Sequence, residues 1–202
     1  GRSSSAFAQA PGPSPVVLNA AMAKRVAEYD AAVKLASNEN PWGPLDSVMQ
    51  AMTGAWKYSY RYGYPDGGIL QAIADHHGVS PQHILLGAGS GEILDVAGWT
   101  FLQNGLKVLG FEPTYNSVFA QATSLKTDAI RLQLSKDYSQ SMPALITAAR
   151  RHHRELGFIY LCNPNNPTGT AVTRSEIAQL LDGIPADLPV LIDEAYHHYA
   201  ED

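Results

Sequence analysis

Two polar side chains follow apolar runs in the second half of the chain, where they could bind one ligand. Asn166 lies in segment 163–169 (NPNNPTG), directly after the apolar run 158–162, and Asp193 follows the apolar run 190–192. An acid at the end of a buried strand is costly unless it meets a cation or hydrogen-bond donors. Their spacing fits one strand-helix-strand unit, so we expect both side chains on neighbouring parallel strands, facing one ligand.

Two earlier loops offer further groups for a ligand. Segment 87–92 (GAGSGE) contains Gly89, Ser90 and Gly91 between an expected strand and a helix. Backbone N–H groups in such a turn can approach an anion, although many strand-to-helix turns are glycine-rich for other reasons. The segment lacks the spacing of a dinucleotide fingerprint and the Lys-Ser/Thr ending of a nucleotide P-loop. Tyr115 follows the next expected strand, and its ring could stack on a flat cofactor or cap the core.

A regular alternation of strands and helices must position these loops. The expected strands are 84–86, 107–110, 129–134, 158–162 and 190–192, and the helices between them are 92–102, 115–125, 143–154 and 174–181. This order predicts an α/β fold with three layers, in which a mostly parallel sheet has helices on both faces. Ligands of such sheets bind beyond the carboxyl ends of the strands, which is where the loops above lie.

Composition excludes several classes of function. The chain has 202 residues, of which 45% are hydrophobic, and its 14 Lys and Arg residues are outnumbered by 19 Asp and Glu residues. We therefore expect no nucleic-acid partner. The apolar stretches, such as 190–192, are far shorter than the roughly 20 residues that a membrane-spanning helix needs, so we expect no such helix. The histidines at 76–77, 152–153 and 197–198 are adjacent pairs, which do not face one ligand on a helix, so we expect no metal site.

The first residues carry a separate hint about localisation. Ala6-Phe7-Ala8 fits the A-x-A pattern of a signal-peptidase site, which would make the protein exported or periplasmic. The alternative is an ordinary N-terminal tail on a cytoplasmic protein.

A flat, aromatic, phosphorylated ligand with a protonated ring nitrogen fits all four loops. The segments GAGSGE (87–92), EPTY (112–115), NPNNPTG (163–169) and DEAY (193–196) occur in the order found in class I/II aminotransferases. These enzymes have the aspartate aminotransferase fold and use pyridoxal 5'-phosphate (PLP). Segment 37–44 (SNENPWGP) and the YGYPD segment at 62–66 are similar to motifs of the histidinol-phosphate aminotransferase branch. The chain thus resembles a PLP-dependent aminotransferase of that branch.

The resemblance implies a role for each matching residue around PLP. Asp193 would pair with the protonated pyridine nitrogen, Asn166 and Tyr196 would bind the ring oxygen O3′, and Tyr115 would stack on the ring. The phosphate would be bound by three residues of the glycine-rich turn, namely Gly89, Ser90 and Gly91.

The N-terminal motifs imply two further roles. Asn40 is a candidate substrate contact, or simply part of a turn. Tyr64 would reach the phosphate in the neighbouring subunit of a homodimer with shared active sites, but Gly63 separates it from Arg61-Tyr62, so Tyr62 is the alternative.

The resemblance also implies a domain organisation. We expect a flexible tail or signal-peptide remnant at 1–18, an N-terminal arm and small-domain segment at 19–66, and the first part of the PLP-binding large domain at 67–202. The family's Schiff-base lysine lies in an S-x-S-K motif downstream of DEAY. We therefore expect this chain to be truncated before the catalytic lysine, with a natural fragment as the alternative.

The function implied is transfer of an amino group between an amino acid, or an amino-phosphate such as histidinol phosphate, and a 2-oxo acid. Two alternatives remain: a PLP-dependent decarboxylase or lyase on the same fold, and a non-catalytic PLP-binding module.

Overall fold

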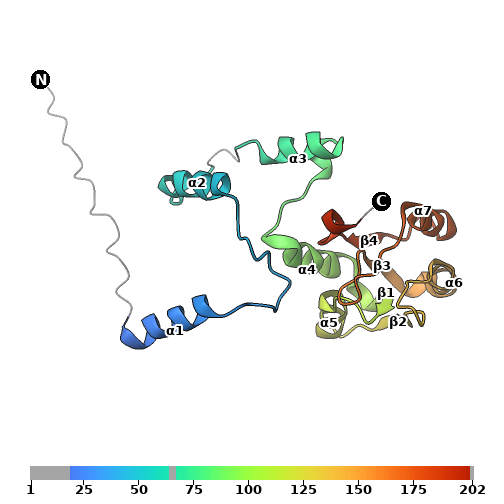
Figure 1. Ribbon diagram of the computed structural model, residues 1–202. Coiled ribbons are helices and arrows are strands. Elements are labelled where there is room, and N and C mark those ends of the chain that lie inside the picture. Colours follow the sequence, from blue (N-terminus) through green and yellow to red (C-terminus); the bar gives the residue numbers. More distant parts are fainter. Residues whose placement is uncertain (1–18, 64–66, 201–202) are drawn as a thin grey trace, which may run out of the picture. The chain divides into compact units, whose positions relative to one another are not determined.

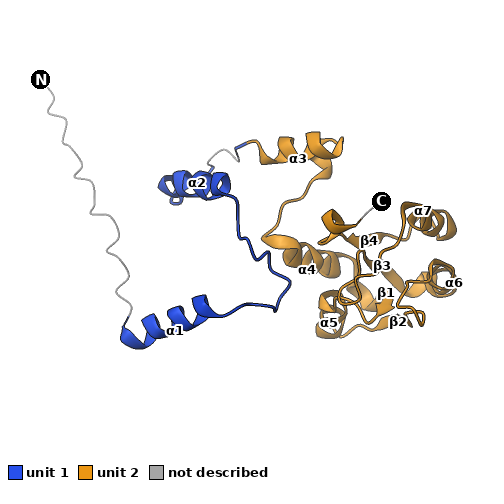
Figure 2. Ribbon diagram, in the orientation of Figure 1, with its two compact units in different colours: residues 1–67 blue, residues 68–202 orange. Residues whose placement is uncertain are grey.

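The structure is a computed structural model that describes residues 19–63 and 67–200. It divides into two compact units, Gly1–Gly67 and Gly68–Asp202, which Figure 2 shows in different colours. The expected signal-peptidase site at Ala6–Ala8 and the expected partner-site residue Tyr64 lie outside the described residues. The two units are described separately below.

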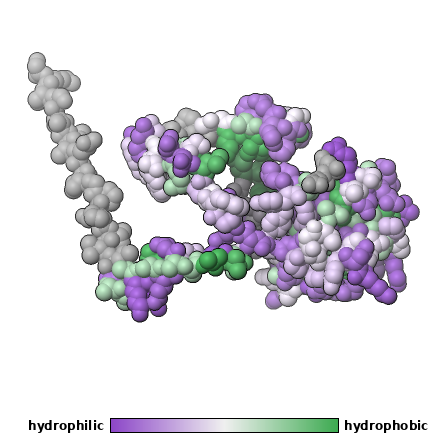
Figure 3. Space-filling model, in the orientation of Figure 1, coloured by the Kyte–Doolittle hydropathy of each residue, from purple (hydrophilic) through white to green (hydrophobic). Residues whose placement is uncertain are grey.

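The described residues of the first unit form two α-helices. These are α1 (Ala20–Ala31), which Asn19 caps by accepting a hydrogen bond from the N–H of Met22, and α2 (Asp46–Ala55), which continues into a short 3₁₀ turn. Neither helix has a buried residue. Many large apolar side chains stay exposed there, including those of Met22, Val26, Val48, Met49, Met52 and Trp56, and Figure 3 shows green patches over this unit.

The second unit is built on a parallel sheet. Its strands are β1 (Lys107–Glu112), β2 (Ala129–Gln133), β3 (Leu156–Cys162) and β4 (Val190–Asp193), in the order β2-β1-β3-β4 (Figure 1). All three pairings are parallel. The expected α/β fold with a parallel sheet is therefore confirmed.

The described part of the second unit also contains five α-helices and several short 3₁₀ turns. The α-helices are α3 (Ile69–His77), α4 (Gly89–Phe101), α5 (Ser117–Ser124), α6 (Met142–His152) and α7 (Arg174–Gly183). The start of α7 is fixed by a capping box, in which Thr173 and Glu176 each accept a hydrogen bond from the other's backbone N–H. Within the described ranges, no helix is both long and apolar enough to span a membrane.

Strand β3 divides the core into two apolar layers, because side chains along a strand alternate between its faces. Phe158, Tyr160 and Cys162 pack in one cluster with residues of α4 and α5, whereas Ile159 and Leu161 pack in another with residues of α6 and α7. Every residue of β3 is buried. A strand covered on both faces needs a continuous apolar run, which is what the sequence has at 158–162.

The expected strand at 84–86 does not form, and that prediction is wrong for the described residues. The backbone is extended at Ile84, but the segment pairs with no strand in the described part of the sheet, and Leu85 is 70% exposed. An apolar run becomes a strand only where another strand can satisfy its N–H and C=O groups. Helix ends also differ from expectation, since α4 begins at Gly89 and α5 at Ser117.

Candidate functional site

Asp193 ends β4, and its carboxylate is held on both oxygens. The residue is 8% exposed. Its Oδ2 accepts a hydrogen bond from the Tyr160 hydroxyl at 3.1 Å, and its Oδ1 accepts one from the N–H of Ala195 at 3.2 Å. A buried carboxyl group is costly unless its oxygens meet such donors. Two donors thus hold the Asp193 side chain in one orientation at the carboxyl edge of the sheet.

Asn166 and Tyr196, which the family resemblance assigns to one ligand atom, lie beside each other. The Asn166 Nδ2 donates to the Tyr196 hydroxyl at 3.5 Å, at the long limit of a hydrogen bond, and both side chains are half-buried. Strands β3 and β4 bring their loops together, with Cys162 opposite Asp193 and the N–H of Asn163 donating to the backbone oxygen of Asp193 at 2.9 Å.

Tyr115 lies in the loop between β1 and α5, with its side chain 42% exposed. A neighbouring residue that sequence reasoning missed, Asn165, fastens this loop to the 163–169 loop. Asn165 is 2% exposed; its Oδ1 accepts from the Thr114 hydroxyl at 2.6 Å, and its Nδ2 donates to the Pro113 oxygen at 3.1 Å. Asn165 therefore ties together the loops that carry Tyr115 and Asn166. The signal in the sequence was its place beside Asn166, between two prolines.

The glycine-rich turn forms the beginning of α4. Gly89 has a φ of +77°, a left-handed conformation that favours glycine, and no side chain caps the helix. A helix N-terminus without a side-chain cap leaves first-turn N–H groups available for an anion. Glu92 was not singled out from the sequence, yet its Oε2 accepts a hydrogen bond from the Ala88 N–H at 2.5 Å and so braces the turn.

Helix packing joins the glycine-rich turn to the Tyr115 loop. The Gln121 Nε2 on α5 donates to the backbone oxygen of Asp95 on α4 at 2.7 Å. The two helices approach closely there, and Gly98 permits this approach. A Cβ at Gly98 would lie only 1.7 Å from the Gln121 side chain. Both helices pack on the face of the sheet that carries Tyr160 and Cys162.

Cys162 and Asp193 are directly opposite each other in the parallel ladder, so their side chains leave the sheet on the same face. This is the face that α4 and α5 cover. The Asp193 carboxylate therefore lies on the same side of the sheet as α4, which begins with the glycine-rich turn, and α5, which follows the Tyr115 loop.

The site residues expected from the N-terminal motifs belong to the first unit. The Asn40 side chain closes its own turn, donating to the Gly43 oxygen at 3.0 Å and accepting from the Trp42 N–H at 3.1 Å. Tyr62 is fully exposed. The roles of Asn40, Tyr62 and Tyr64 at the site remain predictions.

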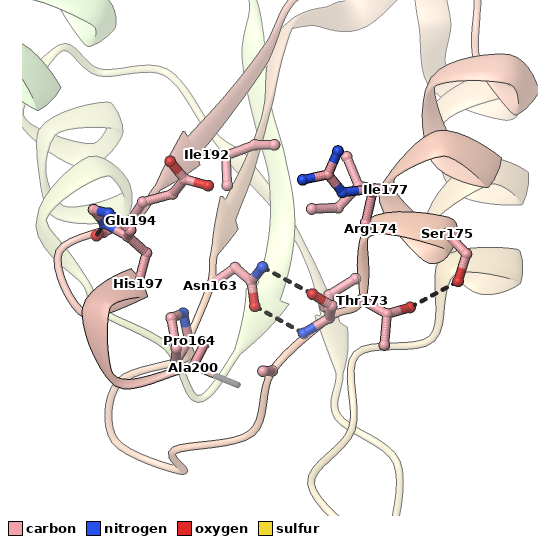
Figure 4. A pocket seen from close by; sticks show the side chains of 12 residues that line it. Asn163, Pro164, Thr173, Arg174, Ser175, Ile177, Ile192, Glu194, His197 and Ala200 are labelled. Atoms are coloured by element: carbon pink, nitrogen blue, oxygen red, sulfur yellow. Dashed lines mark hydrogen bonds between the residues drawn. The ribbon is translucent and has the colours of Figure 1, made fainter. Parts of the chain in front are cut away.

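A hollow of about 910 Å³ lies on the opposite face of the sheet. Figure 4 shows it between the beginning of α7 and the end of β4, with Arg174, Ile192 and Glu194 among its lining side chains. Ile192 belongs to the α6 and α7 side of the core, and none of Asp193, Asn166, Tyr196 and Tyr115 lines the hollow. It is distinct from the candidate site. The described residues also contain no cluster of three or more His, Cys, Asp or Glu side chains that could hold a metal ion.

Replacing Asn165 with aspartate is expected to destabilise the second unit by about 3 kcal/mol. The substitution keeps the shape but removes the Nδ2 donor to the Pro113 oxygen, and it places an acid among buried acceptors. Urea unfolding followed by circular dichroism measures the change.

Asn116→Asp is the matched control for this substitution. Asn116 lies at the beginning of α5, is exposed, and makes no side-chain cap hydrogen bond. Equal unfolding midpoints for the two variants would contradict a structural role for Asn165.

Comparison with known proteins relates these loops to one family. A family model described as aminotransferase class I and II matches residues 30–202. The aromatic amino acid aminotransferase of Rhodococcus jostii is 34% identical over 174 residues, which are 85% of this chain and 47% of that protein. Histidinol-phosphate aminotransferase 1 of Bacillus cereus is 34% identical over 173 residues, which are 84% of this chain and 45% of that protein.

A solved structure has the same fold. The histidinol-phosphate aminotransferase of Sinorhizobium meliloti, solved in complex with pyridoxal-5'-phosphate, matches with a TM-score of 0.73 and 26% identity, over 82% of this chain and 44% of that one. The chain spans about half the length of the curated relatives that it matches.

Proposed function

Since the chain belongs to the class I and II aminotransferases, we propose that it forms the PLP-binding part of an enzyme that transfers amino groups. The donor is an amino acid or an amino-phosphate such as histidinol phosphate, and the acceptor is a 2-oxo acid. The observation that carries the proposal is the Asp193 carboxylate, buried and held by two donors at the carboxyl edge of β4.

Asp193 fits the ring nitrogen of PLP. A protonated pyridine nitrogen is a cationic donor, and a fixed carboxylate in a poorly solvated place is its natural partner. Bound PLP supplies a ring that draws off the electron pair released when the substrate Cα–H bond breaks. The part of Asp193 is to keep the ring nitrogen protonated by accepting its hydrogen bond.

Asn166, Tyr196 and Tyr115 fit the rest of the ring. The 3.5 Å contact between the Asn166 Nδ2 and the Tyr196 hydroxyl brings two polar groups to one place, which supports their binding of one ligand atom, O3′. Tyr115 is partly exposed near the end of the neighbouring loop, just before α5, which suits a ring that stacks on one face of a flat ligand. Asn165 holds the two loops in register by its hydrogen bonds.

The beginning of α4 fits the phosphate. Ser90 offers a backbone N–H group and a hydroxyl, and Gly91 offers a backbone N–H group. The N–H of Gly89 donates to the Gly87 oxygen at 2.8 Å, so Gly89 contributes through the shape of the turn. The space around Gly89 and Gly91 is open, since a Cβ at either would meet nothing within 4 Å. The dipole of α4 adds a favourable field for a dianion.

The remaining parts of the proposal concern substrate and assembly. Asn40 contacts the substrate, and Tyr64, or Tyr62 in its place, reaches the phosphate in the neighbouring subunit of a homodimer. The similarity of the 37–44 and 62–66 segments to the histidinol-phosphate aminotransferase branch supports both.

Amino-group transfer in the intact protein tests the proposed function. Purified protein loaded with PLP is given 2-oxoglutarate with either histidinol phosphate or an aromatic amino acid, and glutamate formation is measured beside carbon dioxide release. We expect glutamate from at least one donor and no carbon dioxide. Carbon dioxide without glutamate would identify a decarboxylase, and PLP binding with neither product would identify a non-catalytic module.

A further inference from the structure

Tyr160 places one polar atom inside an apolar layer. It lies in the middle of β3 and is 1% exposed, with its ring packed edge-on against Phe119 at 6.0 Å between centroids. Its cluster otherwise consists of apolar side chains from α4, α5 and the sheet, together with Cys162. A phenylalanine would fill this space with the same ring, so packing alone does not explain the hydroxyl.

The hydroxyl of Tyr160 reaches Asp193. Tyr160 lies two residues before Cys162 on the same face of β3, and Cys162 is opposite Asp193. The Tyr160 O–H donates to the Asp193 Oδ2 at 3.1 Å, while the Ala195 N–H holds Oδ1. With both oxygens bound, the carboxylate has one orientation, and each donor stabilises its charge.

The Tyr160 hydroxyl stays protonated near neutral pH and therefore remains a hydrogen-bond donor. Burial above all, and then the neighbouring Cys162 and Asp193, raise the pKa of the Tyr160 hydroxyl far above its ordinary value. Burial likewise raises the pKa of the Cys162 thiol, so this neighbour stays uncharged near neutral pH. The direction of the Tyr160 hydrogen bond is therefore fixed.

We propose that Tyr160 is a positioning residue that orients the Asp193 carboxylate and stabilises its charge for the protonated ring nitrogen of PLP. The inference rests on the proposed function, because it requires Asp193 to face that nitrogen. Tyr160 itself touches neither PLP nor substrate in this proposal. Tyr160 acts on PLP only through its hydrogen bond to Asp193, and Asp193 acts on the ring nitrogen. The effect of Tyr160 on PLP binding must therefore depend on that nitrogen.

A ligand that lacks the ring nitrogen tests this dependence. The intact protein and its Tyr160→Phe variant are titrated with PLP and with 1-deaza-PLP, in which C–H replaces the nitrogen, and the dissociation constants are measured by fluorescence quenching. We expect the substitution to raise the Kd for PLP about tenfold, as for a lost hydrogen bond to a charged group, and to change the Kd for the analogue less than about twofold.

Tyr138→Phe is the matched control, because Tyr138 is 60% exposed and lies outside the site. It should leave both constants unchanged, and thermal unfolding of all three proteins checks the fold. Equal weakening of PLP and analogue by Tyr160→Phe would show a merely structural role and overturn the proposal. If the wild type binds PLP and Tyr160→Phe weakens the binding of neither PLP nor the analogue, the role of Tyr160 is overturned. The proposed function would still stand in that case. Failure of the wild type to bind PLP would refute both.

Discussion

Replacing Asp193 with asparagine is expected to lower the PLP affinity of the intact protein about a hundredfold or more. The amide keeps the shape and can still accept one of the two hydrogen bonds, but it has no charge to offer the pyridinium. Removing one partner of a buried charge pair costs about 3 kcal/mol or more, and about 1.4 kcal/mol is a factor of ten. Equilibrium titration with PLP measures the change, and turnover should fall with it.

Asp182→Asn is the matched control, since Asp182 is exposed on α7 and lies outside the site. It should bind PLP like the wild type. An Asp193→Asn protein that folds normally and retains its PLP affinity would show that Asp193 does not pair with the ring nitrogen.

Replacing Gly157 with alanine is expected to destabilise the second unit by about 3 kcal/mol. Gly157 lies in the buried strand β3, and a Cβ there would be 1.9 Å from the backbone oxygen of Phe101 at the end of α4. That oxygen belongs to the main chain and cannot rotate away like a side chain, so strand and helix must separate. Urea unfolding monitored by circular dichroism measures the loss.

Gly54→Ala provides a control of the opposite sign. Gly54 lies in α2 of the first unit, and a Cβ there would meet nothing within 4 Å. Alanine should favour that helix by about 0.5–1 kcal/mol, because it has less backbone freedom to lose than glycine. An unfolding midpoint of Gly157→Ala equal to that of the wild type would mean that β3 does not approach α4 so closely.

Gly157→Ala and Asp193→Asn affect different properties of one part of the second unit, namely its packing and its ligand binding. Gly157 sets how closely β3 approaches α4, and Tyr160, three residues later, holds Asp193. The close packing that Gly157 permits therefore belongs to the same strand that positions the carboxylate. A variant that moves β3 away from α4 should weaken PLP binding as well as stability, whereas Asp193→Asn should mainly affect binding.

Much of the fold could be predicted from the sequence because its signals are local. Apolar runs such as 158–162 and 190–192 mark buried strands wherever they occur, and the helical stretches between them predict parallel pairing. The same reasoning placed Asn166 and Asp193 at strand ends, where β3 and β4 do bring their loops together. The run at 84–86 shows the limit, since it has the composition of a strand but no described strand beside it.

By itself, the sequence determined the alternation of strands and helices, the loops that carry polar groups, and the family to which those loops belong. Only the tertiary structure decided that the Tyr160 hydroxyl donates to Asp193, which lies 33 residues later in the chain. It also decided that Asn165 joins the 163–169 loop to the Tyr115 loop through Thr114, which lies 51 residues earlier. Composition and periodicity report which face of an element is apolar. Which side chain meets which depends on strand register and on how closely elements approach, and these are set by packing between segments far apart in the chain.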